Sequence, residues 1–338
     1  MQKTNIAWAE CTWNPVVGCT KCSPGCENCY AERMAARLNG IFAAKGDDDN
    51  WARYSNILKF DTSQREEGRA VGWNGQVELC YDRLEQPLHW RKPRMIFVPS
   101  MGDLFHPAVP FEFIDKVMAV IALCPQHTFQ VLTKRAERMR EYFNEMALGK
   151  RHIGDSLRKI GQEGFVQRLV VAKSMMVGKN GMPPYKTPAN LWLGVTCCNQ
   201  QEADKNIPFL LQTPAAVRFL SLEPLLGPID LTKTEIPNTS GGGFGNMRCS
   251  PLAVQKGTYN SIVSVCLAPL DWVIIGAESG PKRRPCKLEY VYSIAEQCKE
   301  AGVLLFIKQL DIDGKLVRDI EKFPKDLRIR QMPGKEGK

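Results

Sequence analysis

The sequence contains no long apolar stretch and no sign of export. No segment approaches the roughly 18 uninterrupted apolar residues that a membrane-spanning helix requires. The N-terminus, MQKTNIAWAE, lacks the basic segment and the apolar run of a secretory signal. These absences predict a cytoplasmic protein without a membrane partner. Its cysteines are expected to stay reduced, so that clustered cysteines indicate a metal before a disulfide.

Two further features are missing. The glycine-bearing segment 276–280 does not have the G-x-G-x-x-G spacing, so no dinucleotide site is expected there. There is also no evident internal repeat, and no change of composition marks the boundary of an independent domain. We therefore expect a single domain over residues 1–338, with insertions near 39–86, 150–188 and 233–269.

Short apolar runs alternate with helical segments along the chain. Each run is short and mainly apolar rather than cleanly alternating, which is typical of strands buried on both faces of a parallel sheet. The predicted strands span residues 95–99, 128–132, 191–195, 217–222, 272–276 and 303–307, and the predicted helices 111–123, 135–148 and 287–301. With an opening strand near 13–17, this alternation predicts an α/β fold, an incomplete TIM-like (β/α) barrel with loop insertions.

Positive charge is in excess. The 338 residues carry a formal net charge of +9, and the excess is greatest in residues 131–179 and in the tail from Gly314 onward. A basic surface suits nucleic acid or another anionic partner. A solvated face that aids solubility is the alternative, and composition alone does not distinguish the two.

The most specific local feature is a cluster of cysteines near the N-terminus. Of thirteen cysteines, four lie within eleven residues, at Cys19, Cys22, Cys26 and Cys29. Thiolates this close together on a Pro-Gly loop can meet at one centre, as in iron–sulfur and zinc loops. Two three-cysteine spacings coexist: C-x3-C-x2-C begins at Cys22 and C-x6-C-x2-C begins at Cys19. Zinc could use all four thiolates, although the loop would be unusually cramped for it.

Several sequence blocks carry a family resemblance. They include TWNPVVGCTKCSPGCENCYAERMA (12–35), FVPSMGDLFHPAVP (97–110), RFLSLEPLLGPIDL (218–231) and LDWVIIGAESGPKRRP (270–285). In this order the blocks resemble the phage Gp37/Gp68 family, also classified as DUF5131, whose members carry a three-cysteine motif and are regarded as radical S-adenosylmethionine (SAM)-like. The family motif has the C-x6-C-x2-C spacing. The resemblance therefore implies Cys19, Cys26 and Cys29 as metal ligands, with Cys22 as a possible substitute.

The resemblance further implies a barrel of the radical SAM type, a [4Fe-4S] cluster and SAM as cofactors. Three thiolates leave one iron open for SAM, and electron transfer from the cluster cleaves SAM to a 5′-deoxyadenosyl radical. One position departs from the usual loop. An aromatic residue commonly precedes the third cysteine, whereas Asn28 stands there and Tyr30 follows Cys29. The usual aromatic contact with adenine therefore has no matching residue.

Polar residues follow the predicted strands, and barrel active sites are built at the carboxyl ends of strands. Glu223 lies in a tight turn before Pro224, where its carboxylate could receive the SAM amino group or ribose hydroxyls. Asp103 could instead cap a turn before Phe105, and Lys134 could begin a surface helix. His106, in a loop beside the predicted site, is a candidate for acid–base steps. The predicted cofactor-binding residues are Ser100, Asp103, Thr133, Lys134, Ser221, Glu223 and Glu278.

Three hypotheses about function follow. The first is a radical SAM enzyme acting on a large or anionic substrate, such as a nucleic-acid base or a nucleotide, with a reductant protein as electron source. The second is a non-catalytic nucleic-acid-binding protein whose loop holds structural zinc or an iron–sulfur cluster. The third keeps the cluster but makes this chain one subunit of a system in which a partner protein holds the substrate.

Overall fold

The structure is a computed structural model that describes residues 4, 6–63, 68–161, 187–232, 235–236, 247–248 and 270–334. The insertions expected near 150–188 and 233–269 lie largely outside these residues, whereas most of 39–86 is described. The chain divides into two compact units, each of which is discontinuous in sequence. The first comprises Met1–Thr133 and Glu145–Leu191, and the second Lys134–Asn144 and Trp192–Lys338.

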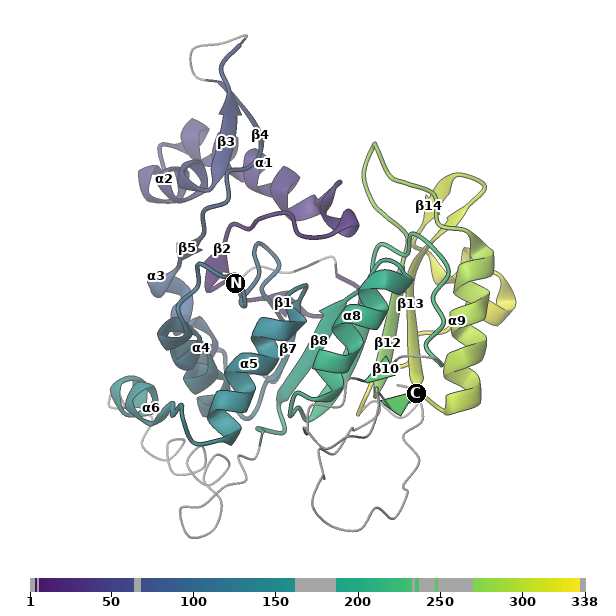
Figure 1. The fold of residues 1–338 in the computed structure, drawn as a ribbon. Coiled ribbons are helices and arrows are strands. Elements are labelled where there is room, and N and C mark those ends of the chain that lie inside the picture. The colour runs from purple at the N-terminus through teal and green to yellow at the C-terminus, as the bar shows by residue number, and fades with distance from the viewer. Residues whose placement is uncertain are drawn as a thin grey trace. The chain divides into compact units, whose positions relative to one another are not determined.

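Three parallel strands form the sheet of the first unit, in the order β1 (Cys11–Thr12), β6 (Met95–Val98) and β7 (Thr128–Thr133) (Figure 1). Ile96 pairs with Cys11 on one side and with Phe129 on the other. The connection from β6 to β7 is α4 (Phe111–Leu123), most of whose residues are buried. Its span matches the sequence prediction because apolar residues recur at helical spacing along its whole length.

The opening strand expected near 13–17 is replaced by two shorter strands. β1 ends at Thr12, and β2 (Val16–Val17) pairs antiparallel with β5 (Glu78–Leu79). Trp13, Asn14 and Pro15 separate the two strands. Pro15 has no N–H to give to a sheet, and its carbonyl accepts a hydrogen bond from the Cys80 N–H (2.8 Å). The run therefore belongs to two different sheets.

The expected insertion near 39–86 packs into a local core that it shares with residues before and after it. Its helices are α1 (Tyr30–Lys45), which starts before it, α2 (Asp48–Asn56) and α3 (Tyr81–Leu84), with a 3-10 turn at Gln86–His89. Strands β3 (Leu58–Asp61) and β4 (Arg69–Trp73) form an antiparallel hairpin. The buried residues of this core are Val17, Ala31, Ala35, Tyr54, Ile57, Leu58, Cys80 and Met101. The same unit also contains α6 (Gly154–Gly161).

The second unit contains four parallel strands and one antiparallel edge strand. Their order is β8 (Leu191–Thr196), β9 (Val217–Leu222), β12 (Trp272–Gly276), β13 (Leu304–Ile312) and β14 (Lys315–Val317). The helix α8 (Gln200–Leu211) contacts β9, and α9 (Leu288–Ala301) contacts β13 (Figure 1). Most of α5 (Ala136–Ala147) also belongs here. Two-residue strands β10 (Glu235–Ile236) and β11 (Met247–Arg248) pair antiparallel, and short 3-10 turns occupy Ile320–Lys322 and Lys325–Leu327.

These units confirm a mixed α/β fold built on parallel strands. β8 is buried at every position and β12 is buried throughout, as the continuously apolar runs predicted. The helix predicted at 287–301 begins one residue later, and Gly302 ends it in the left-handed conformation at a φ of 67°. Among the described helices, none combines the length and the apolar character needed to cross a membrane.

Candidate cofactor site

The cysteine loop begins at Gly18, directly after β2. The Gly18 N–H donates to the Met101 carbonyl (2.9 Å), and Gly18 forms a parallel bridge with Gly102 in the loop after β6. The φ of Gly18 is +91°, and a Cβ there would lie 2.5 Å from the Gln76 carbonyl oxygen. Any other residue would be strained and would clash at this position. The glycine thus fixes where the loop starts, against the segment that follows β6.

The loop ends at the first turn of α1. A short 3-10 turn, Pro24–Cys26, is capped by Ser23, whose Oγ accepts a hydrogen bond from the Gly25 N–H (3.0 Å). Cys29 immediately precedes α1. Two of the cysteines are therefore held by helical turns rather than by an extended loop.

Exposure separates the two cysteine spacings that the sequence left open. Cys26 is buried, Cys19 and Cys29 are half-buried, and Cys22 is exposed to solvent. The C-x6-C-x2-C spacing thus uses thiols that are all at least partly shielded from solvent. The C-x3-C-x2-C spacing would use the exposed one.

Burial raises the pKa of the Cys29 thiol above its ordinary value. The backbone N–H groups of Glu32 and Ala31, in the first turn of α1, act in the opposite direction because a helix N-terminus stabilises negative charge. A charge on the neighbouring Cys26 thiol raises the pKa further. The Cys26 and Cys29 sulfurs are thus close enough to interact electrostatically.

The chemistry of the three thiols fits an iron–sulfur cluster, which is held by cysteine thiolates. In the part of the chain that the structure describes, which includes all four clustered cysteines, no three His, Cys, Asp or Glu side chains are arranged to hold a metal ion. The Cys19 thiol donates to the Thr20 carbonyl (3.4 Å). Ligation by all three cysteines therefore requires the Cys19 side chain to turn away from this carbonyl.

Two side-chain contacts join the cysteine loop to the segment after β6. The His106 Nδ1 accepts a hydrogen bond from the Ala108 N–H (3.2 Å), so we assign the ring hydrogen to Nε2, which donates to Thr20 Oγ1 (2.9 Å). The Tyr30 hydroxyl donates to the Ser100 carbonyl (2.6 Å). These contacts give His106 and Tyr30 positioning roles, which their sequence positions did not predict.

The predicted residues of the first unit gather at the carboxyl ends of β6 and β7. Both the N–H and the hydroxyl of Ser100 donate to Asn14 Oδ1 (2.6 and 3.2 Å). Asp103 is buried, and its Oδ1 accepts hydrogen bonds from the Phe105 N–H (3.0 Å) and the Thr133 hydroxyl (2.7 Å). The turn-capping role considered for Asp103 is therefore present, and the same carboxylate also links β6 to the end of β7.

In the second unit, Glu223 follows β9 and forms an ion pair with Lys308 of β13. Glu223 Oε1 accepts a hydrogen bond from Lys308 Nζ (2.6 Å), and Oε2 accepts one from the Ser221 hydroxyl (3.3 Å). The side chains of Glu223 and Lys308 are 14% and 26% exposed, so the pair is largely shielded but accessible. A Cβ on Gly276 of β12 would lie 2.5 Å from Glu223 Oε1. Glycine is therefore needed at 276 for the carboxylate to lie over β12.

Glu278 and Lys134 have other neighbours. The buried carboxylate of Glu278 accepts from the Arg284 N–H (2.7 Å) and from its guanidinium through Nε (3.1 Å) and Nη2 (2.5 Å). It thereby closes the turn between residues 278 and 284.

Lys134 lies near Cys197, at the end of β8. Burial and then the Glu202 carboxylate raise the pKa of the Cys197 thiol, and the Lys134 ammonium opposes them.

The predicted residues thus form two sets within the described structure. The first unit brings the cysteine loop together with Ser100, Asp103 and Thr133, and the second brings Ser221 together with Glu223. Sequence reasoning missed Asn14, whose partners are 86 and 87 residues away. The only available signal was a polar residue at the end of a short apolar run.

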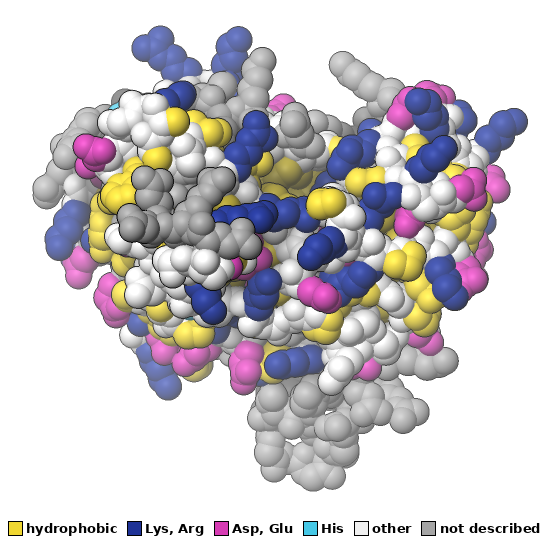
Figure 2. Space-filling view, turned by 90° about the horizontal axis from the view of Figure 1, so that it is seen from above, with side chains coloured by type: hydrophobic (Ala, Val, Ile, Leu, Met, Phe, Trp, Pro, Cys, Tyr) yellow, Lys and Arg dark blue, Asp and Glu magenta, His cyan; other side chains and the backbone are white. Residues whose placement is uncertain are grey.

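Basic side chains are prominent on the surface. Figure 2 shows Lys and Arg side chains spread over the face that it displays, with Asp, Glu and exposed hydrophobic side chains among them. Lys and Arg outnumber Asp and Glu in the full sequence, 45 against 36.

Comparison with known proteins gives one family. A model of DUF5131, described as a protein of unknown function, matches residues 3–335. No curated protein and no solved structure matches the chain. Because the match covers nearly the whole chain, this protein belongs to the DUF5131 family.

Proposed function

We propose that this protein is a radical SAM enzyme in which Cys19, Cys26 and Cys29 hold a [4Fe-4S] cluster and a fourth iron position remains open for SAM. The parallel strands would then belong to an incomplete TIM-like barrel of the radical SAM type. When bound, the reduced cluster would supply electron transfer to SAM and so a 5′-deoxyadenosyl radical for hydrogen abstraction.

The observation that carries this proposal is the setting of the cysteine loop. It leaves β2, is joined to the segment after β6 at Gly18, Thr20 and Tyr30, and presents shielded thiols at Cys26 and Cys29. A zinc or structural loop has no need for polar groups at the carboxyl ends of the neighbouring strands. This loop has Ser100, Asp103 and Thr133 beside it.

The other predicted residues support cofactor binding to different degrees. Glu223 is the strongest candidate in the second unit, because its carboxylate is partly exposed and Lys308 and Ser221 orient it. Such a group could receive the SAM amino group or ribose hydroxyls, while Lys308 could receive a carboxylate. Glu278 is engaged by Arg284 and would act by shaping its turn.

The proposed substrate class is a nucleic-acid base or a nucleotide. The net charge of +9 and the basic side chains in Figure 2 support an anionic substrate. A reductant protein would supply the electron, and a partner protein could present the substrate.

Anaerobic reconstitution with iron and sulfide tests this proposal. The wild-type chain is expected to become brown, to bind about four irons, and to release 5′-deoxyadenosine from SAM when a reductant is added. Cys19→Ala is expected to lose both properties. Cys22→Ala is the matched control on the same loop, and it is expected to keep both because the Cys22 thiol faces solvent.

The alternative of a non-catalytic nucleic-acid-binding protein makes different predictions for the same samples. A colourless chain that takes up stoichiometric zinc, never cleaves SAM and binds nucleic acid in a salt-dependent manner would establish that alternative. Loss of the cluster in Cys22→Ala with retention in Cys19→Ala would instead favour the C-x3-C-x2-C spacing.

A further inference from the structure

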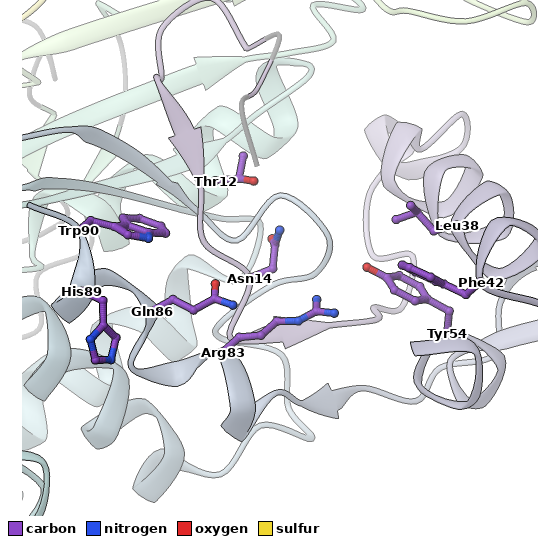
Figure 3. Close-up of a pocket in the computed structure, with 9 residues that line it drawn as sticks. All are labelled: Thr12, Asn14, Leu38, Phe42, Tyr54, Arg83, Gln86, His89 and Trp90. Atoms are coloured by element: carbon purple, nitrogen blue, oxygen red, sulfur yellow. The ribbon is translucent and has the colours of Figure 1, made fainter. Parts of the chain in front are cut away.

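A cavity of about 390 Å³ lies within the first unit, and none of the four clustered cysteines lines it. Leu38 and Phe42 of α1 and Tyr54 of α2 form one side, and Arg83 of α3 reaches toward them from the other side (Figure 3). Trp90, just after the following 3-10 turn, lies farther along the cavity (Figure 3). The volume is in the range of sites for small organic molecules.

One side of the cavity is apolar. The rings of Phe42 and Tyr54 stack with their centroids 5.7 Å apart and their planes 24° apart. Tyr54 is buried in the local core, whereas Leu38 and Phe42 pack on this core and keep part of their surface accessible. A flat, apolar group of a ligand could therefore pack against Phe42 and Leu38.

Asn14 brings a buried polar group to the cavity. Asn14 is only 7% exposed. Its Oδ1 accepts hydrogen bonds from the Ser100 N–H, the Ser100 hydroxyl and the Met101 N–H. These three contacts fix which end of the amide is oxygen. No group in the described part of the chain accepts a hydrogen bond from Nδ2, although the residue lines the cavity between its two sides (Figure 3).

Tyr54 and Arg83 bring two further hydrogen-bond donors to the cavity. The Tyr54 hydroxyl points toward the Arg83 guanidinium in Figure 3. Burial raises the pKa of Tyr54 and Arg83 lowers it, with a net upward shift, so the phenol keeps its hydrogen at neutral pH. Arg83 donates to Asn50 (2.7 Å), and its Nε is 3.8 Å from Asp82. Within the described residues, no Asp or Glu lines the cavity.

A cavity that offers a guanidinium, an amide N–H and a phenol O–H without an acidic lining residue is complementary to an anion. We propose that this cavity binds a small organic anion with a flat apolar body, whose carboxylate or phosphate meets Arg83 and Asn14 Nδ2 while its body packs on Phe42. This proposal does not depend on the cluster or on SAM chemistry, because none of its residues belongs to the cysteine loop.

Two pairs of probes test the proposal on the full-length protein without added metal. Isothermal titration calorimetry compares AMP with adenosine and 3-phenylpropanoate with 3-phenylpropanamide. At least one anion is expected to bind, and to bind at least tenfold more tightly than its neutral counterpart. The pair that responds tells whether the site takes a phosphate or a carboxylate. If neither anion binds, or if each binds no more tightly than its neutral counterpart, the proposal is wrong.

Substitutions of residues that line the cavity test whether any anion that binds does so in this cavity. Gln86 lines the cavity but is exposed, so its replacement does not endanger folding. Gln86→Lys is expected to tighten anion binding several-fold, and Gln86→Glu to weaken it by a similar factor. Arg83→Gln is expected to weaken it at least tenfold, whereas Arg37→Gln, at an exposed position of α1 outside the cavity, is the matched control and leaves it unchanged.

Asn14→Asp gives the sharpest test, because the carboxylate keeps an acceptor for Ser100 and Met101 but replaces the Nδ2 donor by a negative oxygen. It is expected to abolish anion binding. Circular dichroism verifies that the variant is folded. If it is not folded, the anion affinities of Gln86→Lys and Gln86→Glu test the proposal in its place. Anion affinity that is equal in both Gln86 variants and in Arg83→Gln places the binding elsewhere and refutes the proposal.

Discussion

Individual cysteines differ widely in their environments. Cys22 is exposed, whereas Cys286 and Cys298 are almost completely buried. Burial raises the pKa of Cys298 to about 12, and burial together with the Asp311 carboxylate raises the pKa of Cys286 to about 12. A thiol with such a pKa is almost entirely protonated at neutral pH, so these two side chains act as apolar packing groups.

The raised pKa of Cys298 predicts a loss of stability in alkaline solution. Its pKa is higher in the folded state than the ordinary value of 9.0, so the unfolded chain releases the proton first as the pH rises. The free energy of unfolding should therefore fall between pH 9 and pH 12, by up to about 1.4 kcal/mol per pH unit for this thiol. Below pH 9 the contribution of this thiol is constant.

Urea unfolding of the apo protein at pH 8, 9 and 10 measures this effect. Cys298→Ala lowers stability at every pH through the cavity it creates, but its stability should decline less steeply above pH 9 than that of the wild type. Cys22→Ala is the control, since its thiol is exposed. Parallel declines in wild type and Cys298→Ala would falsify the assignment.

At the scale of elements, β8 and β9 approach each other through a glycine. A Cβ on Gly194 would lie 2.4 Å from the ring of Phe219 on the neighbouring strand. The ring has little room to move, because its centroid is 5.8 Å from that of Trp272 on the next strand and both side chains are buried. The close packing of these three strands therefore depends on the absence of a side chain at position 194.

Gly194→Ala is expected to destabilise the protein by about 1–3 kcal/mol, because the added methyl group overpacks this contact. Denaturant unfolding measures the change. Gly227→Ala is the control, since a Cβ there meets no atom within 4 Å. The double variant Gly194→Ala with Phe219→Leu should lose less stability than the sum of the losses measured for the two single variants. Simple additivity would show that the ring and the methyl group do not collide.

Some elements could be predicted from the sequence because their signals are local. The helix at Phe111–Leu123 and the strands Val217–Leu222 and Trp272–Gly276 begin and end as predicted, since mainly apolar patterns with polar or glycine borders define them. The structure of 39–86 could not be predicted in this way. Half of the buried residues of its core, namely Val17, Ala31, Ala35 and Met101, lie outside the segment.

The same distinction applies to the candidate site. The cysteine loop can be predicted from the sequence because its four cysteines lie close together in the chain. The contacts that hold it, such as His106 with Thr20 and Tyr30 with Ser100, join residues 86 and 70 positions apart. No pattern in a single sequence encodes such pairs, so a positioning role for His106 could not be separated from the acid–base role that its side chain suggested.

At the scale of the whole molecule, the chain passes between its two units three times. Most of α5 belongs to the second unit, although the segments on either side of it belong to the first. In the second unit, Arg140 of α5 donates to Gln212 (2.9 Å) and lies over the Phe209 ring at 4.7 Å. Neither unit is therefore a continuous piece of sequence.

This interleaving predicts that fragments 1–191 and 192–338 do not fold independently. The first fragment would carry α5 without the α8 residues that cover it, and the second would lack α5. Each should show a broad thermal transition by circular dichroism, whereas the full chain should unfold cooperatively. The two fragments co-expressed are the control for complementation. Two fragments that each melt sharply when alone would contradict the prediction.

The side-chain amide of Asn14 connects the segment after β6 with the cavity. One end of its amide holds the backbone at Ser100 and Met101, next to the cysteine loop, and the other end lines the cavity. Hydrogen bonds in series polarise one another, so an anion that accepts from Nδ2 makes Oδ1 a better acceptor. Thermodynamic linkage is reciprocal. If the proposed anion binds, occupancy of the cavity and order in the segment after β6 would therefore favour each other by the same factor, through the single amide of Asn14.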